Sequence, residues 1–307
     1  MALDPPLERF APKIVTFFPK PIPELTPQEF RSIVETAAKR SNPFHPPGVT
    51  AEDLTADLPG AAIPVRIYRP KGDRPHPAIL WLHGGGFVAG SIVTHDPVCA
   101  GICASASCTV IAANYRLAPE HPYPAAQDDA LGLLRWAVGR ASALGIDPER
   151  LAVGGDSAGA TLAIGAAQRL AGVPRLRLLA LAYPVTDGDS TRPSYADTAG
   201  SAYLSRAMME YFLRHYLPGG TSAAAGALPL RSGSLEGLPP TFVVTAGHDP
   251  LHDEGVALVE RLRAAGVAVD HRNAETMPHE FLRYRSLSKV AEAEFQAMCG
   301  VIAKALR

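Results

Sequence analysis

One serine stands in a pattern typical of a catalytic nucleophile. Residues 155–159 read Gly-Asp-Ser-Ala-Gly, which fits the G-x-S-x-G turn that projects a serine hydroxyl from the end of a strand. A helix that follows such a turn directs its positive N-terminus at negative charge developing on a substrate. A capping serine in an ordinary strand–helix turn is the alternative. The apolar strand pattern before the motif and the helical pattern after it favour Ser157 as a nucleophile.

A glycine-rich loop follows the apolar run 78–82. Residues 83–87 read His-Gly-Gly-Gly-Phe, and consecutive glycines leave backbone N–H groups unshielded, able to stabilise an oxyanion. A phosphate loop is not indicated because no Gly-Lys-Ser/Thr follows. No G-x-G-x-x-G with a later acidic residue is present either, so a dinucleotide site is not indicated.

A serine nucleophile needs a base, and the base needs an orienting acid. In the strand–turn–helix context the expected chain order is Ser, then Asp or Glu, then His. Asp249 follows the strand pattern 241–246, and His279 follows the strand pattern 267–269 and precedes the last helix. Asp253 is the main rival for the acid, but Asp249 lies nearer the strand end. Of the other histidines, His83 is interpreted as holding the glycine loop.

The charge balance excludes several classes of partner. The chain has 307 residues, with 29 Lys and Arg against 30 Asp and Glu, so its net charge is −1. A nucleic-acid binder or a polybasic membrane-surface protein usually carries an excess of basic residues. No apolar run approaches the ~20 residues that span a bilayer. The N-terminus lacks a basic stretch followed by an apolar one, so we expect a cytoplasmic protein.

The cysteines give no sign of a metal site. Cys99, Cys103, Cys108 and Cys299 are not accompanied by a Cys-x-x-Cys or a paired-histidine motif. We interpret them as small buried hydrophobes in a reduced protein. No metal and no cofactor is expected.

Short apolar runs alternate with helical patterns, which predicts an α/β fold with a mainly parallel sheet covered by helices on both faces. The strand patterns cover residues 63–68, 78–82, 108–113, 151–153, 176–182, 241–246 and 267–269. The helical patterns cover about 27–39, 96–106, 125–144, 157–170, 206–216, 258–265 and 291–302.

One long stretch interrupts this alternation. Residues 185–234 contain one helical pattern and no buried-strand pattern, which is too long for a simple connection. We expect a cap insertion there, packed against a proline-rich N-terminal cap segment, residues 1–50. The core is then expected to comprise residues 51–184 and 235–307. A cap over the carboxyl ends of the strands would enclose a ligand-binding site and exclude water from it.

Taken together, these motifs resemble the hormone-sensitive-lipase-like family of α/β-hydrolases, in its bacterial carboxylesterase branch. The resemblance spans about residues 55–300. Its carriers are the motifs at 83–87, 90–91, 95–96, 114–122, 155–159, 249–255 and His279. It implies an α/β-hydrolase fold with a helical cap and a triad of Ser157, Asp249 and His279. It also implies oxyanion donors from the backbone of Gly85, Gly86 and Ala158.

The chain departs from the family at one position. The family often has His-Gly-Phe at the base, whereas residues 279–281 read His-Glu-Phe. A carboxylate beside the base is expected to affect its pKa or the shape of the acyl pocket. Arg116 and Glu120, in the 115–122 stretch, and Asp156, inside the elbow, are interpreted as structural.

The resemblance implies a carboxylesterase acting on short- to medium-chain acyl esters. Phe87, Tyr203, Met208 and Phe212 are candidates for binding the substrate. An amidase or lactonase on the same triad, or a ligand-binding protein without turnover, stays open as an alternative. A small-molecule ester is the expected partner; nucleic acid and membrane are not expected, and a homodimer is left open.

Overall fold

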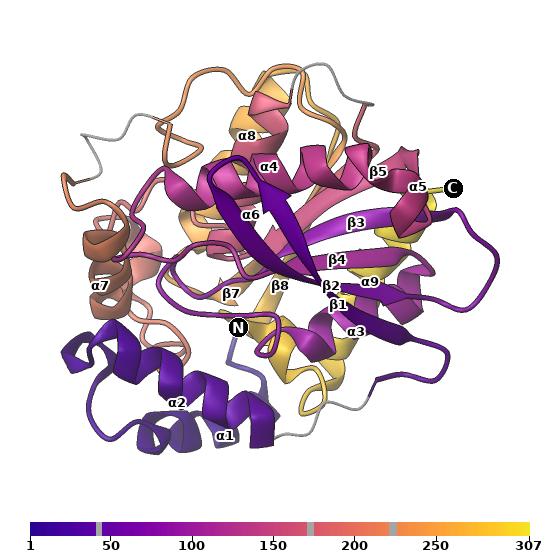
Figure 1. The fold of residues 1–307 in the computed structure, drawn as a ribbon. Helices are drawn as coiled ribbons and strands as arrows, with labels where there is room; N and C mark the ends of the chain where they lie inside the picture. The colour runs from indigo at the N-terminus through magenta and orange to yellow at the C-terminus, as the bar shows by residue number, and fades with distance from the viewer. Residues whose placement is uncertain (41–44, 171–174, 221–225) are drawn as a thin grey trace.

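The computed structural model describes residues 1–40, 45–170, 175–220 and 226–307. Within them, eight strands form one sheet in the order β1-β2-β4-β3-β5-β6-β7-β8 (Figure 1). The pairs β1–β2 and β2–β4 are antiparallel, and every pair from β4 onward is parallel. The prediction of a mainly parallel α/β sheet is confirmed. The strands are β1 (Thr50–Leu58), β2 (Ala61–Arg69), β3 (His76–Leu82), β4 (Thr109–Ala113), β5 (Ile146–Asp156), β6 (Leu178–Ala182), β7 (Thr241–His248) and β8 (Val269–Pro278).

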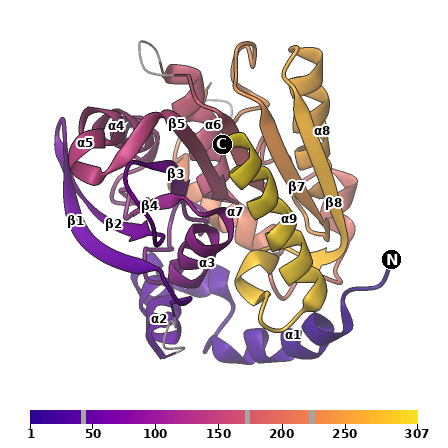
Figure 2. The ribbon, with the colours of Figure 1, turned by 90° about the vertical axis from the view of Figure 1, so that its right-hand side faces the viewer.

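Helices cover both faces of this sheet, as Figures 1 and 2 show. The apolar residues of the central strands therefore pack into two cores, one on each face. This explains why β4 and β6 are buried along their whole length and have no polar face. One face carries α4 (Ala125–Gly139), α5 (Ala141–Leu144), α6 (Ala158–Arg169) and α8 (His252–Ala264), and the other carries α3 (Asp96–Ala106) and α9 (Lys289–Ala305).

The remaining helices lie at one end of the sheet (Figure 1). They are α1 (Pro5–Phe17), η1 (Ile22–Glu24), α2 (Pro27–Arg40), η2 (Pro193–Ala196) and α7 (Arg206–Tyr216). A short helix, η3 (Phe281–Tyr284), precedes α9.

Side chains close in sequence cap the N-termini of α1 and α2. Asp4 caps α1 by accepting from the N–H of Leu7 at 3.4 Å. At α2, Thr26 and Glu29 form a reciprocal capping box, with bonds of 2.8 and 3.2 Å. The N-terminal segment was expected to hold only one helix, so α1 is an addition, and Pro12 lies inside it.

The N-terminal segment and the 185–234 insertion pack against each other. The rings of Phe30 on α2 and Phe212 on α7 lie 5.8 Å apart. Tyr203 donates its hydroxyl hydrogen to the carbonyl of Leu7 on α1 at 2.7 Å. These contacts agree with a two-part cap. The division of the chain into cap and core stays a prediction, and residues 221–225 of the insertion lie outside the described residues.

Both edge strands differ from the sequence prediction. Strand β1 was not predicted, and its residues are exposed or half-buried along most of its length. Strand β8 begins at Val269 and continues to Pro278, well beyond the predicted 267–269. Edge strands expose polar side chains and so lack the continuous apolar runs of buried strands. Because β8 is longer than predicted, His279 follows a strand end directly.

Candidate active site

Ser157 lies in a sharp turn between β5 and α6. Its backbone has φ 54° and ψ −121°, a strained combination for a residue with a side chain. Gly159 makes the turn possible, because a Cβ atom at this position would collide with the carbonyl of Leu82 on β3. The N–H of Ser157 donates to the carbonyl of Ala182 at 2.9 Å, which ties the turn to the end of β6.

Three predicted residues form one hydrogen-bonded chain. The Oγ of Ser157 lies 2.9 Å from Nε2 of His279, and Nδ1 of His279 lies 2.6 Å from Oδ2 of Asp249. The three residues come from the carboxyl ends of β5, β8 and β7, which meet at one edge of the sheet. All three side chains are buried. This is the geometry of a nucleophile, a base and an orienting acid.

The environment of His279 favours its protonated form. Burial of the imidazole lowers its pKa, but the charge and hydrogen bond of Asp249, together with the charge of Glu280, raise it more, so the net pKa is raised. The ring of Tyr183 packs edge-on against the imidazole, with centroids 4.8 Å apart. Tyr183 follows β6 directly and was not singled out from the sequence. The sequence feature that could have identified Tyr183 is its position, as an aromatic residue directly after a core strand.

The glycine loop presents backbone N–H groups beside Ser157. Gly85 and Gly86 line the same cavity as Ser157 and His279. Ala158 is the first residue of α6, so its N–H has no intrahelical partner. Within the described residues, no backbone hydrogen bond uses the N–H of Gly85 or Gly86. Gly86 has φ 61°, and a Cβ atom there would collide with the ring of Phe212 on α7.

A buried polar cluster joins this loop to the elbow. Asp156 lies 3.1 Å from Nε2 of His95 and accepts from Nε1 of Trp81 at 3.2 Å. This agrees with a structural role for Asp156. His83 stacks on Tyr115 at 4.2 Å, and burial together with the nearby His95 lowers the pKa of His83 to about 3. An imidazole with so low a pKa binds a proton weakly, so His83 is poorly suited to act as the base.

The rival acid and the 115–122 stretch have other partners. Asp253 accepts from the N–H of Ser194 at 2.9 Å and lies beside His252. Arg116 pairs with Asp129 at 2.6 Å. Glu120 pairs with Arg31 of α2 at 2.7 Å, so this stretch anchors the N-terminal segment beside the site.

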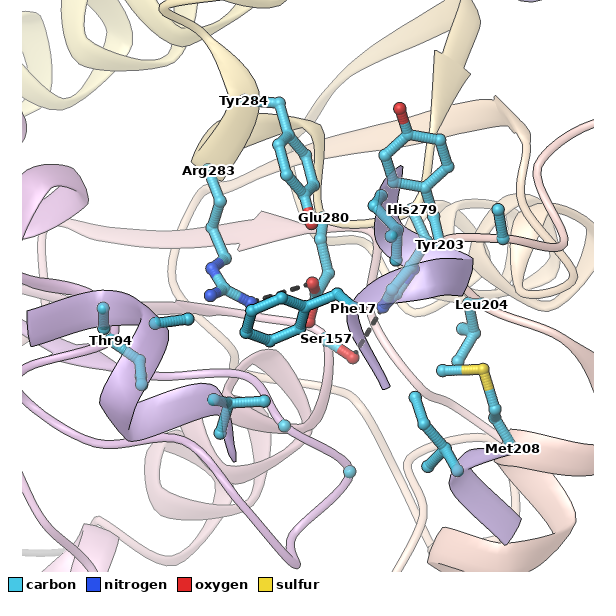
Figure 3. A pocket seen from close by; sticks show the side chains of 18 of the residues that line it. Phe17, Thr94, Ser157, Tyr203, Leu204, Met208, His279, Glu280, Arg283 and Tyr284 are labelled. Atoms are coloured by element: carbon cyan, nitrogen blue, oxygen red, sulfur yellow. Dashed lines mark hydrogen bonds and ion pairs between the residues drawn. The ribbon is translucent and has the colours of Figure 1, made fainter. Parts of the chain in front are cut away.

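A cavity of about 500 Å³ opens over Ser157 and His279 (Figure 3). Its wall is mainly apolar and comes from α1, α2, α7 and the segment before α7. Three of the predicted substrate-binding residues, Tyr203, Met208 and Phe212, line it. Such a pocket suits a small, mainly apolar ligand.

The fourth predicted substrate-binding residue lies elsewhere. Phe87 is not among the residues that line the cavity; it is buried and stacks on Tyr216 with centroids 3.7 Å apart. Its backbone has φ 64°, which turns the side chain away from the direction that an extended continuation of the loop would give it.

Several lining residues were not predicted as pocket residues. Glu280 was expected to affect the base or the shape of the acyl pocket but was not named as a lining residue, and the structure places it in the cavity wall beside Arg283. Lys13, Phe10 and Ile14 reach the cavity from α1, the helix that the sequence did not predict. An amphipathic reading of 5–17 could have found them, but three prolines in that stretch argued against a helix.

In the described parts of the chain, no group of three or more His, Cys, Asp or Glu side chains is arranged to hold a metal ion. The four cysteines are free and buried. Among the described helices, none has the length and apolar character needed to cross a membrane.

Residues 79–283 match the model of a family described as having the alpha/beta hydrolase fold. The chain is similar to carboxylesterase NlhH of Mycobacterium tuberculosis, at 41% identity over 78% of this chain and 77% of that protein. It is also similar to an ethyl acetate hydrolase of Pseudomonas putida, at 42% identity over 76% of each chain.

Among solved structures, the chain is similar to a hyperthermophilic esterase from the archaeon Pyrobaculum calidifontis. The TM-score is 0.90 and the identity 31%, with 100% of both chains covered. Both the family match and the relatives' identity over most of their length agree with the motif-based expectation. The chain therefore belongs to the hormone-sensitive-lipase-like family of α/β-hydrolases and is a carboxylic ester hydrolase.

Proposed function

We propose that this protein hydrolyses short- to medium-chain acyl esters through a covalent acyl-enzyme formed on Ser157. The observation that carries the proposal is the buried hydrogen-bonded chain from Ser157 through His279 to Asp249, with distances of 2.9 and 2.6 Å. A neutral imidazole with Nδ1–H held by the carboxylate presents Nε2 as an acceptor to the serine hydroxyl.

In the first half of the reaction, Oγ of Ser157 attacks the acyl carbon and its proton passes to Nε2 of His279. Asp249 stabilises the imidazolium that forms. The tetrahedral oxyanion accepts hydrogen bonds from the N–H groups of Ala158 and the glycine loop, and removing one such donor typically costs about 10²–10³ in turnover. The imidazolium then protonates the leaving alcohol, and the ester C–O bond breaks.

In the second half, water replaces the alcohol beside His279. The imidazole takes a proton from water, and the hydroxide equivalent attacks the acyl carbon of the ester on Ser157. Collapse of the second tetrahedral intermediate breaks the acyl–Oγ bond, and His279 returns its proton to the serine. The products are the carboxylic acid and the free enzyme, so no metal or cofactor enters any step.

The size and wall of the cavity support the substrate class. A volume of about 500 Å³ lined by Phe17, Phe30, Met208 and Phe212 suits a compact apolar acyl or alcohol group. The ethyl acetate hydrolase to which the chain is similar acts on a small ester by its name. We extend that preference to this protein as part of the proposal.

The proposal is tested by assaying the purified chain on a panel of esters, one lactone and one amide of matched acyl group, with Ser157→Ala as the control. We expect turnover of the short esters and its loss in the variant. Faster cleavage of the amide or the lactone than of the ester would replace the proposed activity. Tight binding without turnover of any substrate would indicate a ligand-binding role.

A further inference from the structure

A charged pair lies in the wall of an otherwise apolar cavity. Glu280 follows the base directly in the chain, and Nη1 of Arg283 donates to its carboxylate at 2.9 Å. Both residues line the cavity with Ser157 and His279. Figure 3 draws the ion pair in the wall of the pocket that Ser157 and Phe17 also line. Their side chains are only partly exposed, at 26% for Arg283 and 21% for Glu280.

The pair keeps hydrogen-bonding capacity for a ligand. A guanidinium has five N–H donors, and within the described residues only Nη1 of Arg283 has a hydrogen-bond partner. The Glu280 carboxylate likewise accepts only this one bond there. Burial lowers the pKa of Arg283, but the charges of Glu280 and of the nearby Tyr284, Asp156 and Tyr183 together raise it more, so the guanidinium stays charged. The open atoms of this partly exposed pair are therefore able to bind a ligand that enters the cavity.

The backbone of Glu280 has a conformation that is uncommon for a residue with a side chain. Its φ is 60°, a left-handed conformation that favours glycine and strains other residues. Strained backbone conformations cluster at active sites, and Glu280 directly follows His279 in the chain.

We propose that the Glu280–Arg283 pair selects esters that carry an uncharged oxygen function near the ester group, such as a ketone or an ether, over hydrocarbon esters of the same shape. This inference rests on the proposed function. The open N–H donors of Arg283 bind the oxygen, which a hydrocarbon isostere leaves unpaired. An anionic group is disfavoured because Glu280 already neutralises Arg283 and would repel a second carboxylate.

Two isosteric pairs of substrates test the selection. One pair places the oxygen in the acyl chain: p-nitrophenyl 4-oxopentanoate against p-nitrophenyl 4-methylpentanoate. The other places it in the alcohol: 2-methoxyethyl hexanoate against butyl hexanoate. For each pair, the ratio of kcat/KM, polar over apolar, is measured in the wild type and in Arg283→Met. Dividing the wild-type ratio by the variant ratio cancels the difference in intrinsic reactivity between the two substrates of a pair.

We expect the polar-over-apolar ratio of at least one pair to fall about tenfold or more in Arg283→Met, the loss of a hydrogen bond to a charged group. Arg272→Met is the matched control, because Arg272 pairs with Glu294 at 2.7 Å and does not line the cavity. Its ratios are expected to equal those of the wild type. If Arg283→Met does not fold, the same ratios are measured in Arg283→Gln, which keeps an N–H donor but loses the charge.

The Glu280→Gln variant provides an independent test of the same inference. Removing the carboxylate leaves the charge of Arg283 uncompensated, so kcat/KM for monoethyl adipate should rise at least fivefold relative to ethyl hexanoate. Wild-type turnover of both members of each pair, with ratios unchanged in the Arg283 variants, would overturn this inference alone. No turnover of any ester by the wild type would instead overturn the proposed function.

Discussion

At the scale of the residue, two neighbouring carboxylates have different surroundings. Asp249 lies 2.6 Å from the base, whereas Asp253 bonds to Ser194 and His252. Asp249→Asn would favour the wrong tautomer of His279 and should lower kcat by about 10⁴. Asp253→Asn should keep kcat within about threefold of the wild type, as expected for a residue outside a catalytic unit. Steady-state kinetics of both variants checks this, and a larger loss in Asp253→Asn would reassign the acid.

Glu280 gives a second prediction at this scale, because its charge raises the pKa of His279. Only the neutral imidazole can accept the serine proton, so kcat/KM is lost as the pH falls through this pKa. The ordinary value is 6.5, and we expect the acid limb of the wild type above it. In Glu280→Gln the limb should move to lower pH.

The matched control for that profile is Glu275→Gln, because Glu275 is exposed on β8 and lies away from the cavity wall. A pH–rate profile of a neutral ester is measured for the three proteins. A limb that stays in place in Glu280→Gln, or that moves equally in both variants, would contradict the electrostatic role of Glu280.

At the scale of the element, the side chain of Arg31 makes several of the hydrogen bonds that hold α2 against the core. Arg31 donates to the carbonyls of Val88 and Ala118 at 2.6 Å each, and pairs with Glu120. Arg31→Met leaves these acceptors unpaired and should lower stability by about 1–3 kcal/mol. Because Phe30 of α2 lines the cavity, KM should rise as well.

Thermal unfolding and KM are compared with those of Lys39→Met, in the same helix. Lys39 is exposed, and its one ion pair within the described residues is a 3.7 Å contact with Glu35, which contributes little to stability. Equal effects of the two substitutions would mean that Arg31 does not anchor the helix.

Element prediction from the sequence worked where burial imposes an apolar pattern. The bounds of α3 and α7 match the predicted 96–106 and 206–216, and the central strands were found from their continuous apolar runs. Strand β1 and most of β8 are half exposed at the sheet edges. Their polar residues interrupt the apolar pattern, so the sequence did not predict them as strands. Helix α1 was missed because its prolines, two of them in its first turn, read as breakers.

The candidate catalytic residues were easier to place from the sequence than the lining of the pocket. Ser157 belongs to a local motif, and Asp249 and His279 were found because strand ends of a parallel sheet meet at one edge. Pocket lining depends on which helix face meets the core, which no local pattern specifies. Arg283 and Lys13 were therefore missed, and Phe87 packs on Tyr216 instead of lining the cavity.

At the scale of the whole molecule, we expect the proposed two-part cap to limit the length of the acyl chain. The cavity of about 500 Å³ is bounded by α1, α2 and α7. We expect kcat/KM for p-nitrophenyl esters to be highest at butanoate to octanoate and to fall at least tenfold by hexadecanoate. A chain-length series in one buffer checks this. Highest activity on long-chain emulsions, with activation at the interface, would contradict the size limit.

The central claim is that the whole fold converges on Ser157 as the covalent nucleophile. The most direct measurement is reaction of the protein with a fluorophosphonate, followed by proteolysis and mass spectrometry of the labelled peptide. The account predicts a single adduct on Ser157, loss of ester hydrolysis in proportion to labelling, and no adduct in Ser157→Ala. An adduct on another residue, or full hydrolytic activity in the Ser157→Ala protein, would contradict it.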